Sequence, residues 1–222
     1  MTILDNLEKI RSEIETAALH CGRQKSDVTL VAVSKMHDKE EILPLLSAGH
    51  RVFGENRVQE AFQKYPDLKQ SYPDLKLHLI GSLQTNKVKE AVSLFDVIET
   101  VDRIELAKKL ADEMKKQNKN IPCFVQVNTG EEPQKGGIVP RETISLVNQC
   151  RDLGLNIIGL MCIPPVEDEP SPHFALLKKL ARQANVSELS MGMSDDFSVA
   201  IQQGATFVRV GTALFGPRSQ QK

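Results

Sequence analysis

The sequence lacks the features that mark several large classes of protein. Its 222 residues contain no tryptophan and only two tyrosines, and 28 Lys and Arg residues are balanced by 29 Asp and Glu residues. A formal net charge of -1 provides no global positive field that would favour nucleic acid or an anionic membrane surface. No run approaches the roughly 20 apolar residues that a membrane helix needs. We therefore expect neither nucleic acid nor membrane as a partner.

The few cysteines lack the spacing of a thiol site. Cys21, Cys123, Cys150 and Cys162 form no C-x-x-C pair, so the sequence predicts neither a metal site nor a redox dithiol. Charged residues interrupt the apolar positions of residues 1–15, unlike those of a secretory signal. Reduced, partly buried cysteines are typical of a cytoplasmic protein, and the cytoplasm is the location we expect.

The chain does contain a regular alternation of apolar runs and helical segments. Residues 3–18 place apolar side chains at helical spacing, with Thr2 as the expected N-cap. The run VTLVAVSK at 28–35 is nearly continuous in apolar residues, as in a parallel strand that is covered on both faces. The expected strands are 28–35, 51–53, 77–80, 96–99, 121–127, 155–160, 188–190 and 206–210. The expected helices that follow them are 38–48, 56–64, 84–94, 102–118, 140–152, 171–184, 194–203 and 212–215.

These eight strand–helix units predict an α/β fold, a single (β/α)₈ TIM barrel with an extra N-terminal helix. Strict alternation implies a parallel sheet, and units of roughly 25–28 residues suit a closed barrel. The alternative, a doubly wound open sheet, is weaker because no G-x-G-x-x-G turn follows the first strand. No linker divides the chain, so residues 1–222 are predicted to form one domain.

Functional residues of such a barrel come from the C-terminal ends of its strands. Lys35 ends the first apolar strand, where burial of an ammonium is unfavourable unless its charge is removed or paired. Desolvation lowers the pKa of an amine and makes it a nucleophile for Schiff-base chemistry. The alternative is a lysine whose ammonium extends to solvent at the rim. Both interpretations of Lys35 stay open on the residues alone.

The loops after the seventh and eighth strands have the composition of a phosphate site. Gly192 and Gly211 permit close approach of the backbone to a ligand. Ser194 and Thr212 are each expected to open a helix, where free N–H groups and the helix dipole favour an anion. These loops are the usual phosphate site of the fold. Plain helix capping is the alternative role of the two hydroxyls.

Two further polar residues lie within apolar strands. Arg209 belongs to TFVRVG, where the strand period places it on one side with Phe207 and Gly211. An inward Arg209 needs a partner, and no carboxylate is obvious by spacing; an outward arginine paired with a helix glutamate is the alternative. His78 alternates with leucines and is expected to be a core histidine with a hydrogen-bond partner.

Taken together, the motifs resemble the pyridoxal-phosphate homeostasis protein family. The matching stretches are LVAVSK (30–35), FGENRVQE (53–60), HLIGSLQTNK (78–87), QVN (126–128), GLM (159–161), SMGMSDDFSVAI (190–201) and RVGTALFG (209–216). They cover nearly the whole chain in the order of the family, which makes the set specific although no single stretch is. One departure is Leu77, where the family commonly has an aromatic residue; we expect it to alter packing rather than the site.

The resemblance implies a fold like the N-terminal domain of alanine racemase, without that enzyme's second domain, and pyridoxal 5′-phosphate (PLP) as cofactor. Lys35 would hold PLP as an internal aldimine, a Schiff base. Ser194, Gly211 and Thr212 would bind the phosphate, and Arg209 would face the pyridine nitrogen.

Three further side chains acquire roles from the same resemblance. Met161 would pack near the cofactor ring, and Asn56 would line the pocket near the aldimine. Lys135 would approach the phenolate side of the ring.

The residues bear on whether the protein turns over a substrate. An arginine does not supply a titrating proton to the pyridine nitrogen, so the ring would be a weaker electron sink. A racemase also needs a second base, usually a tyrosine from the second domain of a partner. Tyr65 and Tyr72, the two tyrosines, are expected to lie away from the strand ends.

We therefore expect a non-enzymatic PLP-binding protein of vitamin B6 homeostasis, which holds the cofactor on Lys35 and passes it to apo-PLP-enzymes. No feature demands a dimer, so a monomer is expected. One alternative is a PLP-dependent, racemase-like enzyme of amino acids. Another is a cofactor-free phosphosugar aldolase that uses Lys35 directly.

Overall fold

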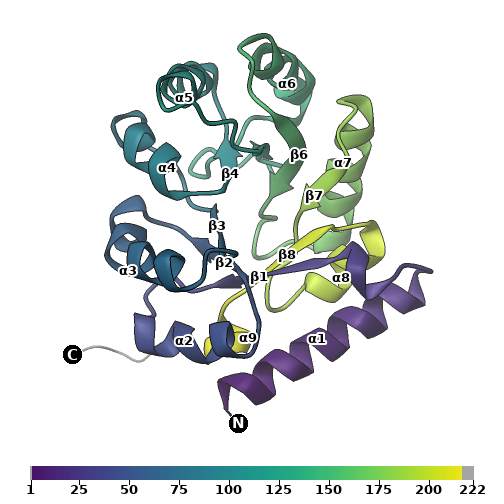
Figure 1. Cartoon of the computed structure of the whole chain (residues 1–222). Coiled ribbons are helices and arrows are strands. Elements are labelled where there is room, and N and C mark those ends of the chain that lie inside the picture. The colour runs from purple at the N-terminus through teal and green to yellow at the C-terminus, as the bar shows by residue number, and fades with distance from the viewer. Residues whose placement is uncertain (1, 217–222) are drawn as a thin grey trace.

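A computed structural model describes residues 2–216, and eight parallel strands form a closed barrel in chain order (Figure 1). The strands are β1 (Thr29–Val33), β2 (Val52–Glu55), β3 (Lys76–Leu79), β4 (Val97–Val101), β5 (Cys123–Val127), β6 (Ile157–Cys162), β7 (Glu188–Ser190) and β8 (Phe207–Val210). Strands β1 and β8 pair from Thr29↔Phe207 to Ala32↔Val210, which closes the barrel. The prediction of a TIM barrel is confirmed.

Helices surround the barrel on its outer face (Figure 1). They are α1 (Ile3–His20), α2 (Lys39–Ser47), α3 (Val58–Ser71), α4 (Val88–Leu94), α5 (Ile104–Lys116), α6 (Thr143–Asp152), α7 (Pro170–Gln183), α8 (Phe197–Gln203) and α9 (Thr212–Phe215). Short 3₁₀ turns are η1 (Lys25–Asp27), η2 (Thr85–Lys87) and η3 (Pro140–Glu142). None of the helices described here is long and apolar enough to cross a membrane. The final six positions of the predicted domain, 217–222, lie outside the described residues.

The extra N-terminal helix begins with the expected cap. Thr2 Oγ1 accepts a hydrogen bond from the Asp5 N–H at 3.1 Å, and the Asp5 carboxylate accepts one from the Thr2 N–H at 2.7 Å. This reciprocal capping box satisfies two backbone donors at the helix start. The apolar stripe of α1 is buried against α8 and α9, so α1 covers the side of the barrel that these two helices form.

The largest differences from the predicted elements lie around β2 and α3. Strand β2 continues through Gly54 and Glu55, and the barrel interior has little room for a side chain at Gly54. A Cβ on Gly54 would lie 2.9 Å from Val31 Cγ1 and 3.1 Å from Ile80 Cδ1. Helix α3 then starts at Val58 rather than 56 and runs to Ser71, well past the predicted end at 64. Its last two turns persist because they bury apolar side chains, and burial outweighs local propensity.

Aromatic rings fill the N-terminal end of the barrel interior. Phe124 and Phe207 meet edge to face with ring centroids 5.6 Å apart, and His78 lies 5.6 Å from Phe207. Gly159 allows this packing, since a Cβ there would lie 2.6 Å from Phe124 Cε1. The interior is thus a packed core at this end, and a cavity can form only toward the C-terminal ends of the strands.

Truncation of Phe124, one of these aromatic side chains, should strongly destabilise the barrel. Phe124→Ala removes a fully buried ring and should lower the free energy of unfolding by about 3–5 kcal/mol. Phe62→Ala, on the exposed side of α3, is the matched control and should change it by less than about 0.5 kcal/mol. Urea unfolding followed by circular dichroism measures both, and equal effects would contradict the assignment of Phe124 to the core.

Candidate functional site

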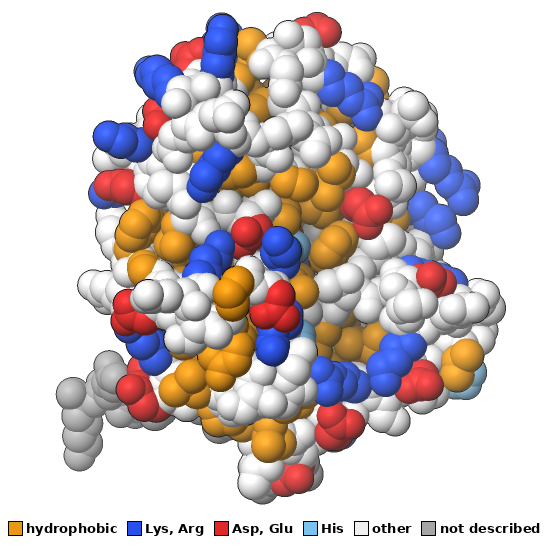
Figure 2. All heavy atoms as spheres, viewed as in Figure 1, with side chains coloured by type: hydrophobic (Ala, Val, Ile, Leu, Met, Phe, Trp, Pro, Cys, Tyr) orange, Lys and Arg blue, Asp and Glu red, His pale blue; other side chains and the backbone are white. Residues whose placement is uncertain are grey.

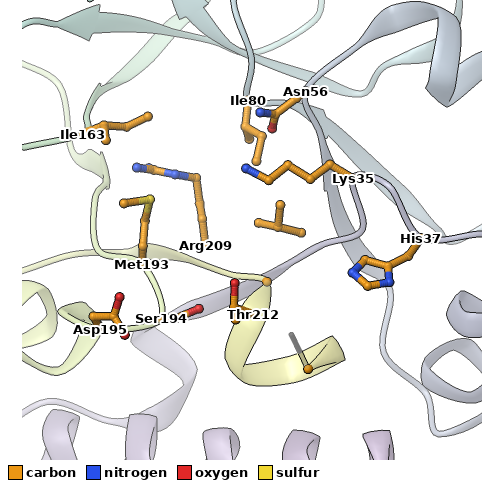
Figure 3. A pocket seen from close by; sticks show the side chains of 13 residues that line it. Lys35, His37, Asn56, Ile80, Ile163, Met193, Ser194, Asp195, Arg209 and Thr212 are labelled. Carbon is orange, nitrogen blue, oxygen red and sulfur yellow. The ribbon is translucent and has the colours of Figure 1, made fainter. Parts of the chain in front are cut away.

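A cavity of about 200 Å³ opens where the chain leaves the C-terminal ends of the strands (Figure 3). The residues around it are Val33, Lys35, His37, Asn56, Ile80, Ile163, Met193, Ser194, Asp195, Arg209, Gly211, Thr212 and Gly216. The space-filling view shows a hollow near the centre of the barrel face, with side chains of both charges at its edge (Figure 2). The cavity is small, which suits one ring compound rather than a dinucleotide.

Six of the seven cofactor-binding residues predicted from the sequence line this one cavity: Lys35, Asn56, Ser194, Arg209, Gly211 and Thr212. The seventh, Met161, is fully buried in β6 and does not line the cavity. Ile163, two residues further along the same side of the chain, lines it instead. The role of Met161 beside a ring therefore stays a prediction.

Lys35 enters the cavity because of the alternation of β1. Val33 lines the cavity within the barrel, whereas Ser34 points outward to α3, so Lys35 is the next inward position. Its side chain extends across the mouth toward Arg209, with Asn56 and Ile80 on one side and Ser194 and Thr212 on the other (Figure 3). An amine, an amide, a guanidinium and two hydroxyls thus face one space.

Arg209 points into the barrel, so the alternative of an outward arginine is wrong. Only 3% of the residue is exposed. One guanidinium nitrogen donates to Ser190 Oγ at 2.6 Å, and the other terminal nitrogen donates to the Cys162 carbonyl at 2.8 Å. The carboxylate of Glu99 lies 3.9 Å away. Glu99 is the interior partner that sequence spacing did not reveal.

Glu99 connects Arg209 to His78 across the barrel. Its carboxylate accepts a hydrogen bond from Ser190 Oγ at 2.5 Å and lies 2.6 Å from His78 Nδ1. Burial by itself would raise the pKa of Glu99, but the hydrogen bond with His78 and the charge of Arg209 outweigh it and lower the pKa. The carboxylate is therefore ionised and balances the buried guanidinium. His78 is the core histidine that the alternation predicted.

The hydroxyls of Ser194 and Thr212 lie in adjoining loops, although only Thr212 opens a helix. The expectation that Ser194 starts a helix is wrong, because α8 begins at Phe197 with Asp196 as its N-cap. The carboxylate of Asp196 accepts a hydrogen bond from the Met193 N–H at 2.5 Å and holds the 193–196 turn together. Ser194 Oγ instead accepts a hydrogen bond from the Ala213 N–H at 3.3 Å, which ties the loop after β7 to the start of α9.

Glycines let these two loops approach the barrel. Gly192 has a φ of +94°, and a Cβ there would lie 2.6 Å from Ala200 Cβ. A Cβ on Gly211 would lie 3.3 Å from both Cβ and the carbonyl oxygen of Val33. Gly211 also lines the cavity, so its backbone can lie close to a ligand there.

A network of buried polar groups lies outside the barrel wall, behind Lys35. Ser34 Oγ donates to Glu55 Oε1 at 2.7 Å and lies 2.6 Å from the hydroxyl of Tyr65. Lys64 Nζ lies 2.7 Å from Glu55 Oε1. The expectation that both tyrosines lie away from the strand ends is wrong for Tyr65, which reaches the end of β1 from α3. It does so on the outer side, however, and does not line the cavity.

Lys135 lines a neighbouring cavity of about 290 Å³ with Ser82 and Gln126. This second cavity shares Asn56, Ile80 and Ile163 with the first. Lys135 Nζ lies 2.7 Å from the Glu132 carboxylate. Its approach to a ring in the first cavity stays a prediction. Among residues 2–216, no group of three or more His, Cys, Asp or Glu side chains could hold a metal ion.

The buried carboxyl group of Glu55 should make stability depend on pH. Burial raises its pKa from 4.5 to about 7, against the opposing effect of Lys64. Because the folded pKa exceeds the unfolded one, the native state binds the extra proton between these pH values, and rising pH removes that stabilisation. Glutamine does not titrate. The stability of the wild type relative to Glu55→Gln should therefore fall by up to about 3 kcal/mol between pH 4.5 and 7, then level off.

Denaturant unfolding of both proteins across this pH range measures the difference. A wild-type advantage that grows with pH would show that Glu55 is ionised throughout and would contradict the raised pKa.

Comparison with known proteins extends over the whole barrel. The family model described as "Alanine racemase, N-terminal domain" matches residues 6–219. A pyridoxal phosphate homeostasis protein of Pasteurella multocida is 38% identical, with 100% of each chain covered. The structure of PipY from Synechococcus elongatus with PLP bound is 37% identical, with a TM-score of 0.84 and coverage of 97% of this chain and 100% of that one. Alanine racemase of Clostridium difficile shares the fold at 16% identity and a TM-score of 0.73, with 98% of this chain and 58% of the racemase covered.

Proposed function

This chain belongs to the family of the alanine racemase N-terminal domain, together with the pyridoxal phosphate homeostasis proteins, and from that premise we propose that it binds PLP and serves vitamin B6 homeostasis. The observation that carries the proposal is the convergence of Lys35, Arg209, Ser194 and Thr212 on one small cavity. These donors match a ligand that combines an aldehyde, a ring nitrogen and a phosphate.

Each group of the cavity has a role in this proposal. Lys35 forms a Schiff base with the aldehyde, and Asn56 lines the cavity beside it. Ser194, Thr212 and the backbone at Gly211 bind the phosphate, because hydroxyl and backbone N–H donors suit an anion. Met161 supports the ring from within the barrel, and Arg209 faces the ring nitrogen.

The position of Tyr65 favours storage over turnover, and Arg209 sets the character of the bound ring. When bound, PLP supplies an electron sink to chemistry at a substrate's α-carbon. Arg209 remains charged and is held by Ser190, Cys162 and Glu99, so it does not transfer a proton to the ring nitrogen. Tyr65, which could have served as a second base, lies behind the wall. We propose that the protein holds PLP and passes it to apo-PLP-enzymes without catalytic turnover.

Oligomeric state and location are part of the same proposal. The donors for aldehyde, phosphate and ring come from a single barrel, which supports a monomer. All four cysteines are free, and three of them are buried, which supports the reducing environment of the cytoplasm.

Titration with PLP tests the assignment of Lys35. The wild type should turn yellow as the Schiff base forms, and Lys35→Ala should bind PLP at least about tenfold more weakly, without the visible band. Lys9→Ala, which alters an exposed lysine of α1, is the control and should behave as the wild type. A colourless wild type that takes up no PLP would overturn the proposal and favour the phosphosugar aldolase.

Incubation of the PLP-loaded protein with amino acids in heavy water separates storage from catalysis. We expect no exchange of the α-proton, detected by mass spectrometry. Exchange with any amino acid would favour the racemase-like alternative instead.

A further inference from the structure

Lys35 lies in a tight turn with an unfavourable backbone conformation. The His37 N–H donates to the Ser34 carbonyl at 3.1 Å, which closes the turn around Lys35 and Met36. Met36 has a φ of 65°, in the left-handed region that side chains other than glycine rarely adopt. Met36 is largely exposed, so packing of its own side chain does not hold this conformation. Contacts from elsewhere must hold the turn.

Helix α3 provides these contacts through two residues, Glu60 and Lys64, which we call the α3 clamp. Lys64 Nζ donates to the Ser34 carbonyl at 2.9 Å and to the His37 carbonyl at 3.0 Å. The carboxylate of Glu60 accepts a hydrogen bond from the Met36 N–H at 2.5 Å. The clamp therefore binds the backbone on both sides of Lys35.

The clamp is held together by its own charges. Lys64 and Glu60 are four residues apart on one face of α3, and Lys64 Nζ donates to Glu60 Oε1 at 2.8 Å. All three N–H groups of the ammonium thus have acceptors. The carboxyl group of Glu55 lies 2.7 Å from the same ammonium on its buried side. These contacts restrain the position of the Lys64 ammonium.

Packing alone does not account for a buried lysine at position 64, because an apolar side chain could fill the same space. The side chain is 8% exposed, and lysine is rarely buried to this degree. A buried ion pair is weak evidence for stability, since desolvation offsets its attraction. The ammonium contributes directional hydrogen bonds, which hold in place the two carbonyl oxygens that flank Lys35. Neither residue of the clamp lines the cavity.

We propose that Glu60 and Lys64 are positioning residues for Lys35, which hold its amine in the orientation that covalent bonding with an aldehyde ligand requires. This inference rests on the proposed function. In the covalent step the Lys35 nitrogen adds to the aldehyde carbon, a C=N bond forms, and the aldehyde oxygen leaves as water. The step requires a fixed approach of the amine. Neither Glu60 nor Lys64 is among the residues assigned to the phosphate and the ring, so in this proposal the clamp acts on the covalent part of binding alone.

Two ligands distinguish the covalent part of binding from the noncovalent contacts to the phosphate and the ring. PLP has the aldehyde, whereas pyridoxine 5′-phosphate has an alcohol in its place and cannot form the C=N bond. We expect Lys64→Met to weaken PLP binding about tenfold and Glu60→Gln about threefold, with affinity for pyridoxine 5′-phosphate unchanged. Both affinities are measured on the full chain by calorimetric titration.

Lys69→Met is the matched control, because Lys69 lies in the same helix and is also partly buried. Its ammonium donates to the Leu94 carbonyl at 2.7 Å and to Asp96 at 2.6 Å, away from Lys35. It should alter neither affinity.

An equal loss for both ligands in the clamp variants would mean that the clamp supports only the fold, and unchanged PLP affinity would mean that it does not act on Lys35; either result overturns the inference. If Lys64→Met fails to fold, Glu60→Gln decides, because it keeps the size of the side chain. A wild type that binds PLP no more tightly than pyridoxine 5′-phosphate would instead refute the Schiff base itself, and with it the proposed function.

Discussion

A guanidinium buried inside an apolar barrel has to be neutralised, and the interior of this protein is arranged around that requirement. Arg209 is balanced by Glu99, which His78 and Ser190 hold in place. Below this layer the aromatic rings of Phe124 and Phe207 close the barrel, and above it the small cavity opens. The ion pair therefore lies between an aromatic core and a polar pocket. It also holds Arg209 beside the cavity, where in the proposed function it faces the ring nitrogen of PLP.

A second set of buried polar groups is paired on the outer side of the barrel wall. Strand alternation places Ser34 outward and Lys35 inward, and likewise Glu55 outward and Asn56 inward. Lys35 and Asn56 are thus each adjacent in the chain to a member of the buried network that reaches α3. Lys64 joins the two strand ends by contacting the Ser34 carbonyl and Glu55. A helix with no contact to the cavity can in this way determine the position of groups within it.

Local patterns allowed the barrel to be predicted from the sequence, together with five residues of the pocket: Lys35, Ser194, Arg209, Gly211 and Thr212. The spacing of the apolar residues indicated the strands, and the positions at the strand ends, such as Lys35 and Thr212, follow from that spacing alone. Glu99 and Lys64 could not be found in the same way, because their partners lie far away in the chain and pairing across a barrel leaves no spacing signal. A glutamate inside the apolar strand VIETV was the one available hint of an inward carboxylate. The helix start at Ser194 was wrong because Asp196, two residues later, is the N-cap and holds the preceding turn.

The most direct test of the account is to locate the covalent bond. The wild type is loaded with PLP, reduced with borohydride, digested, and its peptides are mapped by mass spectrometry. The account predicts a pyridoxyl group on Lys35, and none on Lys64 or Lys135, because Lys35 is the one lysine among residues 2–216 that lines the cavity with Arg209 and Thr212. A pyridoxyl group on another lysine, or on none, would contradict it.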